Sequence, residues 1–280
     1  MKKILLVLAG LVPLLSAAQS RGSFVHFDFG GGMHTMLFTP DGGKKSVGAG
    51  VTLDVSYRYY FSRNLGFRVG LGMSTARSKT VLNCSEEMPW VDPGGTDCLR
   101  RAIFTDWTEK QSLFAFELPM GFCVQTPVSR TLSFIWDVGA ALAVPLNNDY
   151  EIASGTMETR VYYPSTHHEV AGDESVGAKT YETDKASHRL PFGNCSCNLF
   201  TNLGFHYSKR GSLPLYFGLY VSGGVASIVK ANGQNLFTER YNGLLASNRV
   251  NGVFPLAVGV KIGLALDCDR QCRGGRCGFN

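Results

Sequence analysis

The chain has 280 residues, of which 44% are apolar, 18% are charged and 33 are glycine. A mean hydropathy of zero excludes both an acidic disordered chain and a bundle of membrane-spanning helices. The formal net charge of +5 is mild and no run of Lys or Arg accompanies it, so we expect no nucleic-acid partner.

Residues 1–18 have the order of a secretory signal peptide. A charged start precedes an almost wholly apolar run over 4–15, and small residues occupy 16–18. The run is shorter than the roughly 20 residues that a spanning helix needs. We expect cleavage after Ala18, and no lipoprotein, because no cysteine lies at this junction. The remaining chain then leaves the cytosol for an oxidising compartment.

From residue 23 onward, apolar and polar residues alternate with the period of two that is typical of a β-strand. In residues 47–61 every odd position is apolar or aromatic, whereas the even positions hold Gly, Thr, Asp, Ser, Arg and Tyr. The same alternation predicts eight strands, which are 24–38, 47–61, 65–77, 111–125, 131–146, 197–208, 213–229 and 253–267. Each is long enough to cross a bilayer when tilted, for which roughly 9–11 residues suffice.

The connections between these strands alternate in length. The tight turns are 62–64, 127–130 and 209–212. The longer loops that alternate with them are 39–46, 78–110, 147–196 and 230–252. Short turns on one side and long loops on the other are typical of an outer-membrane barrel, with both termini on the short-turn side. The sequence therefore predicts an all-β fold: an eight-stranded antiparallel transmembrane β-barrel with long extracellular loops.

Aromatic residues gather on the apolar face near the short turns, as in the ring of side chains at a membrane–water boundary. This predicted aromatic girdle consists of Tyr57, Tyr59, Phe61, Phe67, Phe122, Phe134, Trp136, Phe205, Tyr207 and Phe217. The opposite face is rich in glycine, which would weaken a water-facing strand but suits a narrow lumen filled by side chains. Both features favour a membrane barrel over a soluble lipocalin-like barrel or a sandwich.

Three segments resemble the outer-membrane β-barrel domain family, in particular PorT-like proteins of OmpA/OmpX-type architecture. They are VGAGVTLDVSYRYYF (47–61), FELPMGF (116–122) and LAVGVKIGL (256–264). The resemblance extends to about residue 267, and it implies an eight-stranded barrel with a secretion-accessory role as one version of its function. We divide the chain into a signal peptide (1–18), an outer-membrane barrel (19–267) and a Cys-rich basic periplasmic tail (268–280).

Strand parity directs seven charged residues into the predicted lumen: Asp28, Asp54, Arg58, Arg68, Glu117, Asp137 and Lys261. Cations and anions in a narrow lumen must pair, because an unpaired buried charge is costly. We interpret the set as a structural network of ion pairs. The alternative is the gate of a narrow ion or small-solute channel, although eight strands leave room for little more than side chains.

His206 and Ser208 resemble the catalytic pair of eight-stranded lipid A deacylases, so a lipid-modifying enzyme is a second alternative. Such an enzyme needs the pair on the barrel exterior near the outer leaflet. Here both residues have inward parity and lie beside the turn 209–212. We therefore expect no catalytic residue and no enzymatic activity. We also expect no metal and no cofactor, since the adjacent His167 and His168 diverge in an extended chain.

The cysteines sort by the predicted side of the membrane. Four are assigned to the outer side, namely Cys84, Cys98, Cys195 and Cys197. The other four are assigned to the inner side, namely Cys123, Cys268, Cys272 and Cys277. Cys84 and Cys98 are the predicted disulfide, because they close the loop 78–110 and a bridge there would add a few kcal/mol of stability.

The long loops are the expected binding surface, since connections on a rigid scaffold usually carry function. We expect the segments 78–110 and 147–196 to bind an unidentified envelope or extracellular partner, while the barrel contacts outer-membrane lipids. The predicted function is a non-enzymatic structural or interaction role at the cell envelope of a Gram-negative bacterium.

Overall fold

The computed structural model describes residues 22–181, 183, 187–189, 195–208, 213–229, 233–238 and 241–268. The predicted signal peptide, the turn 209–212 and the tail beyond Cys268 lie outside the described residues. Among the residues that are described, no helix has the length and apolar character needed to cross a membrane.

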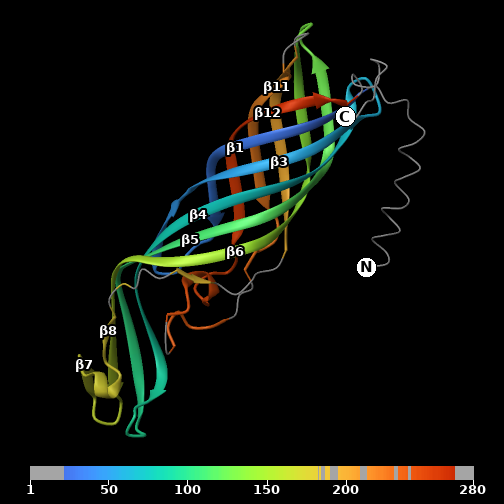
Figure 1. Ribbon diagram of the computed structural model, residues 1–280. Helices are drawn as coiled ribbons and strands as arrows, with labels where there is room; N and C mark the ends of the chain where they lie inside the picture. Colours follow the sequence, from blue (N-terminus) through green and yellow to red (C-terminus); the bar gives the residue numbers. More distant parts are fainter. Residues whose placement is uncertain are drawn as a thin grey trace, which may run out of the picture.

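Eight antiparallel strands pair edge to edge in a closed ring (Figure 1). In ring order they are β1 (Ser23–Leu37), β3 (Ala49–Tyr60), β4 (Leu65–Val91), β5 (Asp97–Pro127), β6 (Leu132–Tyr163), β10 (Ser196–Tyr207), β11 (Leu215–Gly224) and β12 (Phe254–Asp267). Pairing of β12 with β1 and of β10 with β6 closes the ring. The eight-stranded antiparallel barrel is therefore confirmed. Each strand overlaps a predicted one, but β4, β5 and β6 are much longer than predicted and β11 is shorter.

The barrel is apolar on the outside and polar on the inside. Leu53 and Leu71 point outward and are 54% and 55% exposed, whereas the adjacent Asp54 and the nearby Arg68 are buried. Alternation along each strand produces this arrangement, since successive side chains point to opposite faces of a sheet. A barrel surrounded by water has the opposite arrangement, with its apolar side chains inside.

Inward-facing glycines allow this narrow barrel to close. Gly32 pairs with Gly259 across β1 and β12. A Cβ atom added to Gly32 would lie 2.5 Å from the Cα atom of Gly259 and 2.3 Å from the carbonyl oxygen of Val258. No side chain fits at that distance, so the strands require glycine at this point of closest approach.

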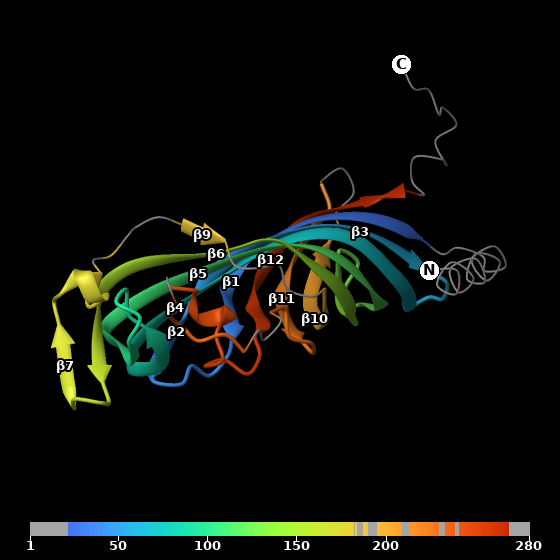
Figure 2. The ribbon, with the colours of Figure 1, turned by 90° about the horizontal axis from the view of Figure 1, so that it is seen from below.

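Strands β4, β5 and β6 continue far beyond the barrel and form an arm (Figures 1 and 2). We call residues 76–112 and 147–181 the arm. Short strands add to its edges, namely β2 (Gly43–Val47) on β4 and β7 (His168–Ala171), β8 (Thr180–Tyr181) and β9 (Ser187–Arg189) on β6. A single 3-10 turn, η1 (Glu174–Val176), lies between β7 and β8.

The long connection over 78–110 is not an irregular loop, because this segment forms a hairpin. β4 and β5 stay paired up to Val91 and Asp97, with a turn of only a few residues between them. The register shifts between Leu82 and Cys84, and shifts again on β5 near Thr108. Such irregularities interrupt the strict alternation by which the barrel strands are recognised in the sequence.

The predicted disulfide between Cys84 and Cys98 is wrong. Cys84 lies opposite Phe104, whereas Cys98 lies opposite Trp90 on the same hairpin. Cys84 and Trp90 are six residues apart on β4, which is roughly 20 Å along a strand, and a disulfide needs Cα atoms within about 7 Å. Both thiols are free, because a hairpin pairs residues about its turn and keeps these two apart.

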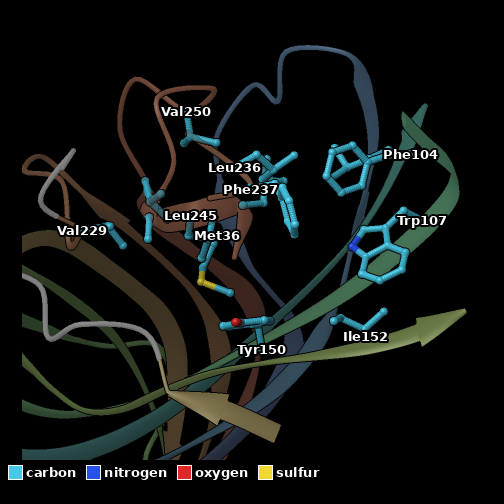
Figure 3. Close-up of a cluster of buried hydrophobic side chains, with 14 of the residues drawn as sticks. Met36, Phe104, Trp107, Tyr150, Ile152, Val229, Leu236, Phe237, Leu245 and Val250 are labelled. Carbon is cyan, nitrogen blue, oxygen red and sulfur yellow. The ribbon is translucent and has the colours of Figure 1, made fainter. Parts of the chain in front are cut away.

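A second long connection, after β11, folds into a cap on the barrel mouth. The cap comprises the described residues of 228–253, namely 228–229, 233–238 and 241–253, and includes the 3-10 turn η2 (Leu244–Ala246). Its apolar side chains pack against Met36, Phe104, Trp107 and others from the strands (Figure 3). Leu236, Phe237 and Leu244 are fully buried there. The sequence predicts only a loop here, so this core was missed.

Candidate functional site

Four of the charged residues predicted to face the lumen form a chain of ion pairs across it. Asp137 Oδ2 accepts a hydrogen bond from Arg58 Nη2 at 2.7 Å and another from Arg68 Nη1 at 2.9 Å. Arg68 Nη2 donates to Asp54 Oδ1 at 2.6 Å. All four side chains are buried. Strands β3, β4 and β6 are therefore tied together through the barrel interior.

The other three charged residues lie inside the barrel but outside this chain of ion pairs. Asp28 Oδ1 lies 4.0 Å from the His26 ring, and Glu117 accepts a hydrogen bond from Ser74 at 2.6 Å. The Lys261 ammonium lies 5.0 Å from the centre of the Tyr220 ring. Among the described residues, no ion pair within 4 Å includes Lys261 or Glu117.

Several uncharged or ring-bearing residues complete the lumen network and were missed. Arg58 Nη1 contacts the His26 ring, and its guanidinium lies 5.5 Å from the centre of the Tyr216 ring. The Asn202 amide donates to Asp137 Oδ2 at 3.4 Å. Inward parity alone places these residues in the lumen. They were not predicted as part of the network because only charged residues were assigned to it.

A small cavity of about 60 Å³ lies between the ion pairs and the cap. Arg68 and Asp54 line one part of it, and Ile228 of the cap lines another. This volume has room for only a few water molecules. The lumen is therefore filled by the ion pairs below this cavity and covered by the cap above it.

His206 and Ser208 lie at the short-turn end of the barrel. His206 is buried in the lumen, with its ring centre 5.8 Å from that of Phe24 and 6.0 Å from that of His26. The Ser208 backbone N–H donates to the Thr131 carbonyl at 2.8 Å. The histidine has no access to the barrel exterior, which is where a lipid substrate would lie.

The ten aromatic residues of the predicted girdle have outward parity beside the short turns. Some of their rings touch across neighbouring strands, at centre-to-centre distances of 6.3 Å for Phe67–Phe122, 5.7 Å for Phe134–Phe205 and 5.6 Å for Phe205–Phe217. Exposure reaches 57% for Phe122 and 43% for Trp136. Large rings so exposed at one rim are suited to a membrane–water boundary.

A buried carboxylate holds the cap to the arm. Glu109 on β5 accepts hydrogen bonds from the Tyr241 hydroxyl at 2.6 Å, the Leu244 backbone N–H at 2.9 Å and the Gln111 amide at 2.8 Å. Burial raises the pKa of Glu109, and the hydrogen bonds offset only part of that shift. Burial together with the neighbouring carboxylate also raises the pKa of Tyr241.

A second contact between cap and arm involves Arg100 on β5. Its guanidinium lies 5.0 Å from the centre of the Trp90 ring and 4.8 Å from that of Phe237. Cation–π contacts of this kind contribute roughly 0.5–2 kcal/mol. The Phe237 backbone N–H in turn donates to Glu86 at 3.1 Å, so the cap is joined to both strands of the hairpin.

The outer face of the arm carries exposed, paired charges. Arg101 lies 2.5 Å from Glu87 and 3.6 Å from Glu169, and Arg160 lies 2.8 Å from Glu158. Pairs this exposed contribute at most about 1 kcal/mol each. Their side chains are available to a partner, and they lie in the two segments predicted to bind one, 78–110 and 147–196.

The described residues contain no group of three His, Cys, Asp or Glu side chains placed to hold a metal ion. His167 and His168 lie at the end of the arm. The His167 Nδ1 atom is 3.0 Å from the Tyr162 hydroxyl, and His168 pairs with Tyr163 at the start of β7.

Comparison with known proteins finds similarity only among solved structures. No family model matches the sequence, and no curated protein matches it. Neisserial surface protein A (NspA) has a TM-score of 0.36 and 11% identity, covering 88% of this chain and 97% of that one. Ail, the attachment invasion locus protein of Yersinia pestis, has a TM-score of 0.32 and 9% identity, covering 88% and 99%.

Ail in complex with the heparin analogue sucrose octasulfate has a TM-score of 0.30 and 8% identity, again covering 88% and 99%. Scores this low carry no argument about function. The strand pairings of this chain itself establish its fold.

Proposed function

We propose that this chain is a non-enzymatic outer-membrane protein whose barrel anchors the arm and cap at the cell surface, where they bind an envelope or extracellular partner. The observation that supports this most is that the apolar residues of β4, β5 and β6 change from the outward face to the inward face along each strand. Within the barrel the outward residues are apolar and the inward ones polar. Within the arm the inward side is apolar and the outward side is charged.

The height of the apolar surface fits a bilayer. On β4 the outward residues run from Leu65 through Leu71 to Met73 and Thr75, and the first outward charge after them is Arg77. The ten steps from Leu65 to Thr75, at about 3.3 Å each and tilted by roughly 40°, span about 25 Å. That is the height of the apolar band of an outer-membrane barrel. Above it, the apolar side chains are buried in the core between cap and arm, as in a domain surrounded by water.

The filled lumen favours an anchoring role over conduction. Ion pairs among Arg58, Arg68, Asp54 and Asp137 cross it, and the cap covers the mouth. A channel would need a continuous wet path. The interior position of His206 argues in the same way against a lipid-modifying enzyme. A secretion-accessory role, implied by the PorT-like resemblance, is one version of this proposal.

Fractionation of the producing cell tests the proposal. The protein should sediment with the outer membrane, resist extraction by alkaline carbonate, and begin at residue 19 when its N-terminus is sequenced. Recovery in the soluble periplasmic fraction would refute membrane anchoring.

Planar bilayers separate anchoring from conduction. We expect silent membranes from the intact protein. Steps of conductance that change when Arg58 or Arg68 is neutralised would favour the channel instead. Lipid A profiles should be the same for the wild type and Ser208→Ala, and a difference would favour the enzyme.

A further inference from the structure

Three cations form an unpaired basic cluster on the outer surface directly above the apolar band. Arg77 and Lys79 lie on β4, and Lys110 lies on β5. All three are exposed. Ser112 lies between Lys110 and Phe114 on the outward face of β5, and below the cluster Thr75 of β4 pairs with Phe114.

Lys79 and Lys110 are direct cross-strand partners. Side chains in such a pair have Cβ atoms about 5 Å apart, and like charges placed there destabilise a sheet. Arg77 is one outward position below Lys79, opposite Ser112. In the part of the chain that is described, no ion pair within 4 Å includes any of the three.

Two carboxylates on β6 flank the cluster. Asp149 accepts a hydrogen bond from Asn147 and lies opposite Arg189 of β9. Glu151 lies opposite Lys110 but makes no ion pair with it within 4 Å. The cluster therefore keeps its excess of positive charge on the β4 side.

The surface at this place is hollowed. A depression of about 470 Å³ is lined by Arg77, Lys79 and Lys110 together with Val47, Asp149 and Glu151. Val47 is 62% exposed, so the hollow joins an apolar side chain to a basic one. An amphiphile with an apolar chain and an anionic head is complementary to both parts.

We propose that the cluster of Arg77, Lys79 and Lys110 binds the phosphate of an outer-leaflet lipid headgroup. This inference rests on the proposed function, because the membrane boundary must lie just below these residues. A phosphate between Lys79 and Lys110 replaces their repulsion with two charge-assisted hydrogen bonds. Arg77 provides a third donor set closer to the acyl chains. The bound lipid fixes the depth at which the arm leaves the membrane.

The test uses the full mature chain in bilayer nanodiscs. The background lipid is zwitterionic phosphatidylcholine, and the probes are a bisphosphorylated lipid A in one arm and phosphatidylglycerol in the other. Lipid retained on the detergent-extracted protein is counted by native mass spectrometry at low and high salt. The variant is Arg77→Gln with Lys79→Gln and Lys110→Gln. The matched control removes three cations from the arm, through Arg101→Gln, Arg160→Gln and Lys179→Gln.

We expect the wild type and the control to retain the phosphate-bearing probe, with retention falling as salt rises. Each cation removed from the cluster should weaken retention about fivefold, and the triple variant should lose roughly a hundredfold. Loss in both arms supports a general phosphate site. Loss in the lipid A arm alone identifies a phosphorylated glycolipid as the ligand.

Equal retention by the variant and the wild type overturns the proposal, as does an equal loss in the control. Failure of membrane placement gives a different result. A chain that does not insert into phosphatidylcholine bilayers, judged by sedimentation and by heat-modifiable mobility in gels, contradicts the proposed function before any lipid preference is measured.

Discussion

The barrel and the arm share the strands β4, β5 and β6, but the apolar side chains point outward in the barrel and inward in the arm. In the barrel, β4 turns Arg68 inward and Leu71 outward, whereas in the arm it turns Leu82 inward and Lys79 outward. The side chains that the chain buries are thus charged in one region and apolar in the other. The difference supports the proposal that the two regions have different surroundings, with the boundary between them near residue 76.

The largest expected effect comes from breaking the interior of the barrel. Asp137→Ala removes the carboxylate shared by Arg58 and Arg68 and leaves two cations buried without it. We expect a loss of about 3–5 kcal/mol in the free energy of unfolding. Urea titration of the protein folded in vesicles measures it. The exposed Asp97→Ala serves as control and should change stability by less than about 0.5 kcal/mol.

The interior of the cap should respond separately from the barrel. Leu236→Ala opens a cavity in the apolar core of the cap, where Leu236 is fully buried, and should cost about 2–5 kcal/mol. Hydrogen exchange should show faster opening of the cap amides with unchanged protection of β1 and β12. Equal loss of protection in the barrel would mean that the two regions unfold as one.

The outside of the barrel distinguishes lipid from water most directly. Leu71→Arg places a charge in the middle of the apolar band and should cost about 2–4 kcal/mol in a bilayer. Val91→Arg is the matched control, because Val91 at the tip of the arm is 53% exposed against 55% for Leu71. Its substitution should be nearly neutral. Equal, small effects at both positions in vesicles would contradict membrane placement.

Acid should stabilise the contact between cap and arm. The pKa of Glu109 is raised by burial above its usual value of 4.5, so the folded cap favours the protonated carboxyl group. Its contribution to stability is complete below the unfolded pKa and is lost as the pH rises through the higher, folded pKa. Hydrogen exchange of the Leu244 amide, corrected for its intrinsic rate, should slow between pH 7 and pH 4. Glu109→Gln should remove this pH dependence, and a variant that keeps it would implicate another group.

The smallest effect is expected at the cysteines of the arm. Cys84→Ser with Cys98→Ser removes two thiols that the hairpin keeps far apart. Reducing agent should therefore leave the unfolding midpoint of the wild type unchanged. A fall in that midpoint, absent from the double variant, would mean that a bridge forms between them.

The barrel strands could be predicted because local residue order determines them. A half-exposed strand must alternate, and an apolar outward face opposite a polar or glycine-bearing inward face repeats in all eight segments. The inward parity of Asp54, Arg58, Arg68 and Asp137 follows from the same alternation. That these four form one continuous set of ion pairs depends on strand register and on the closed ring, and neither is a property of any single segment.

The arm, the cap and the basic cluster depend on contacts between segments far apart in the chain. Glu109 and Tyr241 are separated by 132 residues, yet they share a hydrogen bond at 2.6 Å. Leu236 and Trp107 belong to one core although no periodicity in residues 230–252 indicates a buried segment. The sequence by itself determined which residues alternate, and hence the eight barrel strands and their apolar outward faces. Only the tertiary structure decided which loops continue as strands, which of them covers the mouth, and which exposed cations meet above the apolar band. The physical reason is that alternation is a local steric property of strands, whereas burial and charge pairing depend on which distant side chains become neighbours.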